Sequence, residues 1–302
     1  MRILLTGKNG QLGWELHRQL ERDYEVIALG REDVDFLDLR FLRQVIKQLP
    51  RLDLIVNAAA YTDVDKAEHK SFTAETINSE TTAILAAEAE TRGIPMVHFS
   101  TDYVFDGEQW TRPYREDDQP NPLSLYGWSK LDGEVRLQNI LEKFWIFRLS
   151  GLYGIRRKNF FRTMLKLHQN GIIPKVVDDQ IVSPNWIPLV AEAVMRAIRR
   201  LCQGEKLPWG IFHLSGTGQT SWYEFARLIF EKVNDLRSES APISVTSEEY
   251  GAAAVRPKFS VLDPARFNTV FQYTLPDWRE QFLHFSKEFN FTKGISNSQN
   301  KT

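Results

Sequence analysis

The 302 residues include 38 lysines and arginines against 39 aspartates and glutamates, which gives a net charge of −1. Such a balance argues against a large nucleic-acid surface, which needs a clustered basic excess, and no apolar run is long enough for a membrane helix. The single cysteine, Cys202, excludes an internal disulfide and a cysteine-rich metal site and fits a reducing compartment. We therefore expect a soluble, cytoplasmic protein of one or two domains, without a signal peptide.

The chain starts with a short apolar run, a glycine-rich turn and a helical pattern. Gly7, Gly10 and Gly13 are spaced three apart, between strand-like residues 2–5 and leucines at helical spacing. Glycines at such a turn permit a close approach of the backbone to a pyrophosphate and close packing of the helix on the strand. The free N–H groups of the helix N-terminus would face the phosphates. The pattern predicts a dinucleotide site, and the alternative is an ordinary strand-to-helix turn.

The residues after the second predicted strand, 24–29, bear on the choice between NAD and NADP. An NAD site places an acid there to hold the ribose 2′-hydroxyl. Here Gly30 and Arg31 come before Glu32. An arginine can accept a 2′-phosphate, so we favour NADPH. The alternative for Arg31 is a solvated surface side chain, and Glu32 keeps NADH open.

Strand-like and helix-like patterns alternate along the chain. Apolar runs predict strands over residues 54–56, 96–100, 145–149 and 211–214, and helical spacing predicts helices over 39–49, 71–91, 125–137, 159–169 and 186–200. This alternation is typical of a parallel sheet with helices on both faces. We expect an α/β protein, with a Rossmann-type doubly wound parallel sheet and a smaller C-terminal substrate-binding domain.

The character of the sequence changes after Ser150, and this change sets the expected boundaries. Residues 1–150 would form the dinucleotide-binding domain, with late elements from about 183–215 returning to it. Residues 151–182 and 216–290 would form the substrate domain. The polar residues 291–302 would be a frayed tail.

Residues 100–130 carry the predicted chemistry. Thr101 ends a predicted strand, and Tyr126 and Lys130 are four apart in a predicted helix, so they share one face. An ammonium near a phenol favours the phenolate, so Lys130 is expected to lower the pKa of Tyr126 and let it exchange a proton near neutral pH. Thr101 could add a hydroxyl to the same carbonyl oxygen. This set suits reversible reduction of a carbonyl to an alcohol, and the alternative is an ordinary pair on a helix surface.

With these residues in hand, the chain resembles the extended short-chain dehydrogenase/reductase superfamily. More closely, it is similar to the dTDP-4-dehydrorhamnose reductase family, which makes dTDP-L-rhamnose for bacterial polysaccharides. The resemblance runs from Met1 to about Trp278. Its most specific stretches are Asn-Ala-Ala-Ala-Tyr-Thr-x-Val-Asp-x-Ala-Glu at 57–68 and Ser-Thr-Asp-Tyr-Val-Phe at 100–105, and the others are 7–16, 126–134, 179–180, 256–263 and 275–278.

The resemblance implies NAD(P)H-dependent reduction of the 4-keto group of dTDP-4-dehydrorhamnose. The implied catalytic residues are Thr101, Tyr126 and Lys130. The residues expected at the cofactor are Gly7, Gly10, Gln11, Leu12, Arg31, Asp35, Phe36, Ala60, Tyr61, Thr62 and Phe99, together with Tyr126 and Lys130. Those expected at the nucleotide sugar are Val64, Thr101, Asp102 and Tyr103.

Two departures from the family fall where the sugar should bind. The family has Arg-Thr-Ser-Trp where this chain has Arg148-Leu-Ser-Gly151, and Asp-Gln-x-Gly-x-Pro-Thr where it has Asp179-Gln-Ile-Val-Ser-Pro-Asn185. They put the identity of the sugar in doubt, so a reductase, epimerase or dehydratase for another nucleotide-linked deoxysugar stays open. A dehydratase commonly has Asp-Glu directly after the threonine. Here Asp102 is followed by Tyr103, which disfavours a dehydratase. A non-catalytic NADP-binding regulatory subunit is the alternative from another class, although the catalytic trio is present.

Metal binding and assembly are not assigned by the sequence. The six histidines are scattered, with no His-x-x-x-His pair, so we expect no metal site built on them. Some family members hold Mg²⁺ at a dimer interface through a glutamate at the position of Glu15. Glu15 alone establishes neither Mg²⁺ nor a homodimer here.

Overall fold

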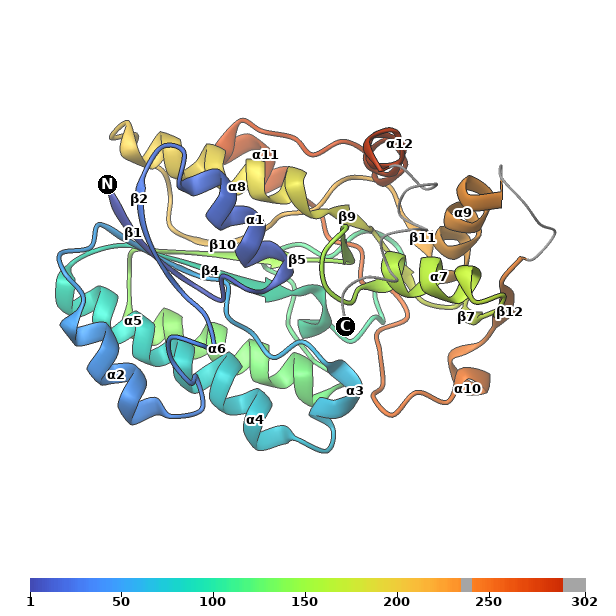
Figure 1. Cartoon of the computed structure of the whole chain (residues 1–302), viewed down its shortest axis with the longest axis horizontal. Helices are drawn as coiled ribbons and strands as arrows, with labels where there is room; N and C mark the ends of the chain where they lie inside the picture. Colours follow the sequence, from blue (N-terminus) through green and yellow to red (C-terminus); the bar gives the residue numbers. More distant parts are fainter. Residues whose placement is uncertain (235–240, 290–302) are drawn as a thin grey trace.

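The computed structural model describes residues 1–234 and 241–289. Over these residues the largest sheet has six strands in the order β10-β5-β4-β3-β1-β2, and all neighbours pair in parallel. Its strands are β1 (Arg2–Thr6), β2 (Glu25–Leu29), β3 (Leu54–Asn57), β4 (Met96–Thr101), β5 (Phe144–Leu149) and β10 (Gly210–His213). Helices cover both faces of this sheet (Figure 1), which confirms the predicted doubly wound α/β fold.

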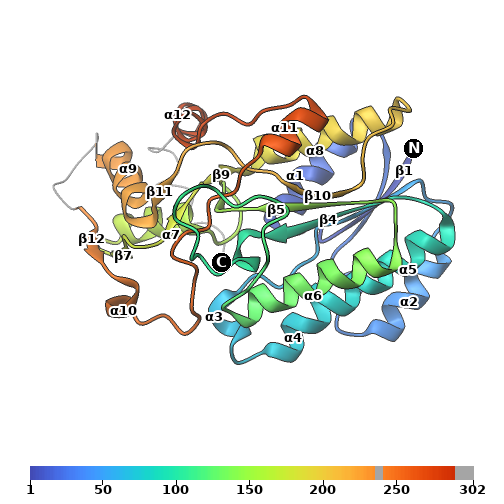
Figure 2. The same cartoon turned by 180° about the vertical axis from the view of Figure 1, so that it is seen from behind.

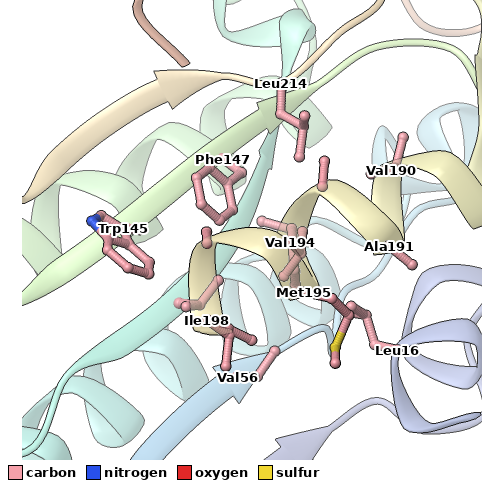
Figure 3. Close-up of a cluster of buried hydrophobic side chains, with 14 of the residues drawn as sticks. Leu16, Val56, Trp145, Phe147, Val190, Ala191, Val194, Met195, Ile198 and Leu214 are labelled. Atoms are coloured by element: carbon pink, nitrogen blue, oxygen red, sulfur yellow. The ribbon is translucent and has the colours of Figure 1, made fainter. Parts of the chain in front are cut away.

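The helices on the two faces bury separate apolar cores. One face carries α1 (Gln11–Leu20), α8 (Ile187–Cys202) and α11 (Ala265–Phe271), and the other carries α2 (Leu39–Gln48), α5 (Thr81–Arg92) and α6 (Leu125–Ile140). Figure 3 shows Val194 and Ile198 of α8 beside Phe147 of β5 in the first core. Because β3, β4 and β5 are covered on both faces, every residue in them is buried.

The order of the strands locates the ligand-binding edge. The chain leaves β1 for β2 on one side and then returns to β3 on the other side of β1. In such sheets ligands bind beyond the carboxyl ends of the strands, at the point where the order reverses. Here that point holds the glycine turn after β1 and the loop that leaves β3 at Asn57.

The helical run predicted over 71–91 is interrupted by a π-helical turn. It consists of α4 (Ser71–Glu75), the π-helix η1 (Thr76–Glu80) and α5. The π turn brings the backbone of Asn78 against α6, where a Cβ on Gly133 would lie 2.3 Å from the Asn78 carbonyl oxygen. The prediction of a helix is confirmed, but hydrophobic spacing does not reveal an inserted residue.

The remaining elements gather beyond the carboxyl edge of the sheet, on the right in Figure 1 and on the left in Figure 2. Their core is rich in aromatic side chains, with Phe161, Phe225, Trp278 and Phe282 all buried. These elements are α3 (Val64–Ala67), the 3₁₀ turn η2 (Asp102–Val104), β6 (Leu152–Tyr153), α7 (Phe160–Gln169), β7 (Lys175–Val177), β8 (Ile181–Val182), β9 (Asn185–Trp186), β11 (Thr220–Ser221), α9 (Trp222–Asn234), β12 (Ile243–Val245), α10 (Ser247–Tyr250) and α12 (Trp278–Glu288).

Two further expectations concern the C-terminal tail and membrane-spanning helices. The tail expected over 291–302 lies outside the described residues. In the part of the chain that the structure describes, no helix has the length and apolar character needed to cross a membrane.

Candidate active site

The glycine turn packs so closely that side chains are excluded from it. Gly7 has φ 77°, and its N–H donates to the Leu29 carbonyl at 2.8 Å. A Cβ on Gly7 would lie 2.5 Å from the backbone of Ala58, and a Cβ on Gly13 would lie 2.1 Å from the Gly7 carbonyl oxygen. Strand β1, helix α1 and the loop after β3 therefore meet at a cradle that any larger residue would fill.

This cradle fits the pyrophosphate of a dinucleotide. Helix α1 begins after Gly10, which has no side chain to cap the helix, so the first N–H groups are left for a ligand. Gln11 is half-buried at the start of the helix, and its carboxamide oxygen accepts from Asn159 Nδ2 at 2.8 Å. Leu12 is buried. The structure thus places three predicted cofactor residues, Gly10, Gln11 and Leu12, at one helix N-terminus.

The residues after β2 form a small charged network. Lys8 Nζ lies 2.6 Å from Asp33 Oδ2 and 3.2 Å from Glu32 Oε1, while Arg31 is exposed beside them. The Lys8 hydrogen bond and then the Gly30 backbone hydrogen bond lower the pKa of Asp33. Glu32 and Asp33, the two acids that could hold a ribose hydroxyl, are thus already paired with Lys8, while the side chain of Arg31 is exposed.

Two predicted cofactor residues lie in the loop between β2 and α2. Asp35 is exposed and accepts from the Leu37 N–H at 3.0 Å. Phe36 is 5% exposed, and its ring lies in the core shared with α2 and α5. Its backbone, rather than its ring, is thus the part of Phe36 that could face a ligand.

The loop after β3 is tied to α6 through the π turn. Asn78 accepts from the Tyr61 N–H at 2.8 Å and donates to the Tyr61 carbonyl at 3.1 Å. It also donates to Ser129 Oγ at 2.8 Å, and Ser129 Oγ donates to the Tyr126 carbonyl at 2.8 Å. These contacts hold Ala60, Tyr61 and Thr62 next to the helix that carries Tyr126. Sequence patterns gave no sign of the role of Asn78.

Thr101 and Asp102 lie at the carboxyl end of β4 in a cluster of hydroxyl groups. Thr101 Oγ1 donates to Asp102 Oδ1 at 3.0 Å, and Asp102 Oδ2 accepts from Ser260 at 2.6 Å and from Ser150 at 2.9 Å. Burial raises the pKa of Asp102 to about 6, and the hydrogen bonds from Ser260, Ser150 and Thr101 oppose that rise. The predicted catalytic threonine is therefore oriented by a buried carboxyl group.

Tyr126 stands between Thr101 and Tyr103. The rings of Tyr103 and Tyr126 meet edge to face with centroids 6.0 Å apart. Burial raises the pKa of Tyr126 to about 12; a hydrogen bond with Thr101 lowers it and the charge of Asp102 raises it. The expectation that Lys130 lowers this pKa is wrong for this structure, because burial dominates and the Lys130 ammonium donates to the Phe99 carbonyl at 2.6 Å.

Lys130 lies inside the protein, under the site. It is 2% exposed, and burial lowers its pKa to about 8, against the opposing charge of Glu134. Glu134 is one turn further along α6 and pairs with Arg148 of β5 at 2.7 Å, with both side chains buried. The face of α6 that turns inward thus carries charged and small residues over most of its length, and Leu137 is its one fully buried leucine. Leu125 and Val135, which helped to predict the helix, are exposed.

Three separated sequence stretches meet around Tyr103. Asp65, next to the predicted sugar residue Val64 at the start of α3, accepts from Arg256 Nη2 at 2.7 Å. Arg256 also lies close to Tyr103, and its charge opposes the rise in the pKa of that phenol caused by burial. Glu68 accepts from the Leu125 N–H at 2.9 Å and so fixes the start of α6. Arg256 was not among the predicted site residues, although it begins one of the family-like stretches.

The two departures from the family touch each other. Gly151 has φ 52°, and a Cβ there would lie 3.0 Å from Pro184 Cα and 3.1 Å from the Ser183 carbonyl oxygen. The Asn185 N–H donates to the Gly151 carbonyl at 3.0 Å. A tryptophan at 151 would meet this backbone, next to Ser150, which donates to Asp102.

Glu15 has protein partners in this structure. Its carboxylate is 4% exposed and accepts from Arg18 and from Gln19, the latter at 2.7 Å. Among residues 1–234 and 241–289, no group of three or more histidine, cysteine, aspartate or glutamate side chains could hold a metal ion.

Comparisons with known proteins point to one family. Residues 1–291 match the family model described as RmlD substrate binding domain. A dTDP-4-dehydrorhamnose reductase of Escherichia coli is 37% identical over 305 residues, which cover 98% of this chain and 100% of that protein. The spore coat polysaccharide biosynthesis protein SpsK of Bacillus subtilis is 42% identical over 262 residues, which cover 86% of this chain and 88% of that protein.

Solved structures agree with these relatives. The crystal structure of a dTDP-4-dehydrorhamnose reductase from Bacillus anthracis in complex with NADP superposes with a TM-score of 0.85. It is 34% identical in sequence, and the match covers 95% of this chain and 99% of that chain.

Proposed function

The chain belongs to the dTDP-4-dehydrorhamnose reductase family, and from that membership we propose that it reduces the 4-keto group of dTDP-4-dehydrorhamnose to give dTDP-L-rhamnose. One observation supports this function in the structure: the Thr101 and Tyr126 hydroxyl groups are hydrogen-bonded at the carboxyl end of a parallel sheet, and Lys130 is buried one turn further along the helix of Tyr126. The protein is thus an NADP-dependent oxidoreductase acting on a nucleotide sugar.

NADPH, when bound, supplies the hydride that reduces C4 of the sugar. The glycine turn and the α1 N-terminus, with Gly7, Gly10 and Gln11, hold its pyrophosphate. Arg31 holds the 2′-phosphate, because it is the exposed cation at the end of β2 while Glu32 and Asp33 pair with Lys8. The NADP complex of the Bacillus anthracis relative supports the choice of NADPH.

Thr101, Tyr126 and Lys130 act at the carbonyl of the sugar. When the sugar binds, the Thr101 hydroxyl turns its proton from Asp102 to the 4-keto oxygen and polarises the carbonyl. Tyr126 gives its hydroxyl proton to that oxygen as C4 receives hydride, so the carbonyl becomes an alcohol. The raised pKa of Tyr126 keeps it protonated before the reaction. Lys130, one turn further along α6, then returns a proton to Tyr126 rather than lowering its pKa at rest.

The sugar lies against the residues that surround Tyr103. Val64 contacts its apolar face, and Asp102 and Tyr103 contact its polar groups. We propose that residues 151–182, 216–234, 241–264 and 276–289 enclose the nucleotide sugar and that residues 1–150 bind the cofactor. Residues 183–215 return to the sheet, and so does α11, which was expected in the substrate domain. The product would supply rhamnose units to polysaccharide biosynthesis, in keeping with the name of the Bacillus subtilis relative. The single cysteine, Cys202, supports work in the cytoplasm.

The test is a substrate comparison. Purified protein is mixed with NADPH and dTDP-4-dehydrorhamnose, and loss of NADPH absorbance is followed. A second reaction contains another nucleotide-linked 4-ketodeoxysugar, because Gly151 and Val182 depart from the family pattern where the sugar should bind. Oxidation of NADPH with dehydrorhamnose supports the proposal. Oxidation only with the second sugar would reassign the substrate, and NADPH binding without turnover on either sugar would favour a regulatory subunit.

A further inference from the structure

A buried polar chain connects the cofactor cradle to Lys130. Thr6 Oγ1 donates to Asn57 Oδ1 at 2.6 Å, Asn57 Nδ2 lies 3.1 Å from His98 Nδ1, and His98 Nε2 lies 3.4 Å from Lys130 Nζ. All four side chains are at most 2% exposed. They come from β1, β3, β4 and α6, so the chain runs across the sheet under the site. The mechanism above uses only its last member.

The orientation of the Asn57 carboxamide is fixed by its neighbours. The Ala59 backbone N–H can only donate, and it points to Asn57 Oδ1 at 3.2 Å. Asn57 Nδ2 points to Thr82 Oγ1 at 3.3 Å, and that hydroxyl donates to the Asn78 carbonyl at 2.8 Å, which leaves it as an acceptor. Rotating the carboxamide would set donor against donor at Ala59, so Nδ2 faces His98.

This orientation fixes the tautomer of His98. Nδ1 must accept from Asn57 Nδ2, so the imidazole proton is on Nε2. Burial, and then the charge of Lys130, hold the pKa of His98 well below its ordinary value, so the ring is neutral. The Nε2–H is therefore aimed at Lys130 Nζ. An ammonium on Lys130 would face this donor, whereas a neutral amine would accept a hydrogen bond from it.

The other contacts of Lys130 suit both of its protonation states. Nζ donates to the Phe99 carbonyl at 2.6 Å whether it is an amine or an ammonium. On its own helix Lys130 faces the charge of Glu134, which Arg148 of β5 pairs at 2.7 Å. Asp102, after β4, acts on the Tyr126 phenol above it. The polar side chains that β3 and the π turn contribute nearby are neutral: Asn57, which contacts His98, and Asn78, which contacts Ser129.

Resting on the proposed function, we propose that His98 is a positioning residue for the reduction. Asn57 holds the imidazole so that its Nε2 proton faces Lys130, and this allows Lys130 to release and regain a proton. Each turnover transfers one proton from Tyr126 to the sugar oxygen. The Lys130 ammonium returns one proton to the Tyr126 phenolate and becomes an amine, which His98 stabilises. Solvent then returns a proton to the amine, and no electrons move in these steps.

Two substitutions distinguish an effect of His98 on the protonation of Lys130 from a purely structural role of His98. His98→Asn keeps an acceptor for Asn57 and removes the donor that faces Lys130. Asn57→Asp replaces the Nδ2 donor by an acceptor, which draws the imidazole proton to Nδ1 and turns the Nε2 lone pair toward Lys130. Both changes favour the ammonium, so each should move the titration of Lys130 upward by about one pH unit or more. His213→Asn is the matched control, because His213 is also buried and neutral but contacts the Tyr114 carbonyl.

The measurement is a ¹³C NMR titration of protein labelled at lysine Cε, with the Lys130 signal identified by its loss in Lys130→Met. The wild-type signal should titrate near the Lys130 pKa of about 8. It should move upward in His98→Asn and Asn57→Asp and stay in place in His213→Asn. The alkaline limb of the pH profile of kcat should shift in parallel.

The experiments distinguish a failure of the role of His98 from a failure of the proposed function. An unshifted Lys130 titration in both variants, with thermal melting showing folded protein, would overturn the role of His98. If His98→Asn does not fold, His98→Phe takes its place, because it also removes the donor that faces Lys130. A wild-type protein that binds NADPH and reduces no nucleotide sugar would overturn the proposed function, while the NMR titration would still decide how His98 acts on Lys130.

Discussion

Ser260 Oγ lies 2.6 Å from Asp102 Oδ2, although 158 residues separate the two in the chain. This contact joins the end of β4 to the segment that also carries Arg256, and it orients the carboxyl group that holds Thr101. Asp102 is therefore the point at which the cofactor side and the sugar side of the site meet.

Asp102→Asn should change how stability depends on pH. The folded pKa of about 6 is above the ordinary 3.8, so this group contributes stability that is full below about pH 4 and is lost as the pH rises through about 6. Asparagine does not ionise. The free energy of unfolding of the variant, relative to wild type, should thus rise by up to about 3 kcal/mol between pH 4 and pH 7. Urea unfolding across this range measures it, and a difference that stays flat would contradict the buried, ionisable assignment.

Glu134→Gln should strongly destabilise the protein. It leaves the Arg148 guanidinium buried without its partner, which costs about 3–5 kcal/mol for a pair of this kind. Arg136→Gln on the same helix is the control, because its pair with Asp132 is exposed and should contribute at most about 0.5 kcal/mol. Urea unfolding compares the two variants. Equal, small losses would mean that the Glu134–Arg148 pair is hydrated.

Tyr126→Phe should lower kcat by about 10²-fold or more, because it removes the proton donor. Binding of NADPH and the melting temperature should change little, since the ring keeps its contact with Tyr103. The control is Tyr250→Phe, whose ring is exposed on α10. Turnover of the Tyr126 variant at the wild-type rate would remove Tyr126 from the chemistry.

Arg31→Ala should weaken NADPH binding about tenfold through loss of one charge-assisted hydrogen bond. NADH lacks the 2′-phosphate, so its affinity should stay the same. Arg22→Ala, another exposed arginine in the turn after α1, should affect neither cofactor. Fluorescence titration gives the dissociation constants of NADPH and NADH for each variant. An equal loss of affinity for both cofactors in Arg31→Ala would show that Arg31 does not bind the 2′-phosphate.

Local patterns were enough to predict the fold. The glycine turn, the buried strands and the alternation of elements all depend on neighbours within about one turn or one strand, and these parts agree with the structure. Helix α6 shows where such reasoning weakens. The spacing of apolar residues predicted the helix, and of these residues Leu137 is buried. The rest of the buried face holds Gly127, Ser129, Lys130, Gly133 and Glu134, because function and close approach dictate those positions.

The parts of the site missed from sequence depend on long-range contacts. Asp65 and Arg256 are 191 residues apart, and Asp102 and Ser260 are 158 apart, so no local period joins them. His98 looked like one more strand residue until the Asn57 carboxamide showed which nitrogen faces Lys130. The expected fall in the pKa of Tyr126 was wrong because residue spacing says nothing of burial, which sets that pKa.

The most direct test of the central claim follows the hydride. Protein is incubated with dTDP-4-dehydrorhamnose and NADPH carrying deuterium at the transferable C4 position of the nicotinamide, and the sugar product is examined by NMR. The account predicts dTDP-L-rhamnose with one deuterium at C4 of the sugar and an equal amount of oxidised cofactor. Product without deuterium at C4, or unchanged sugar in the presence of folded protein that binds NADPH, would contradict it.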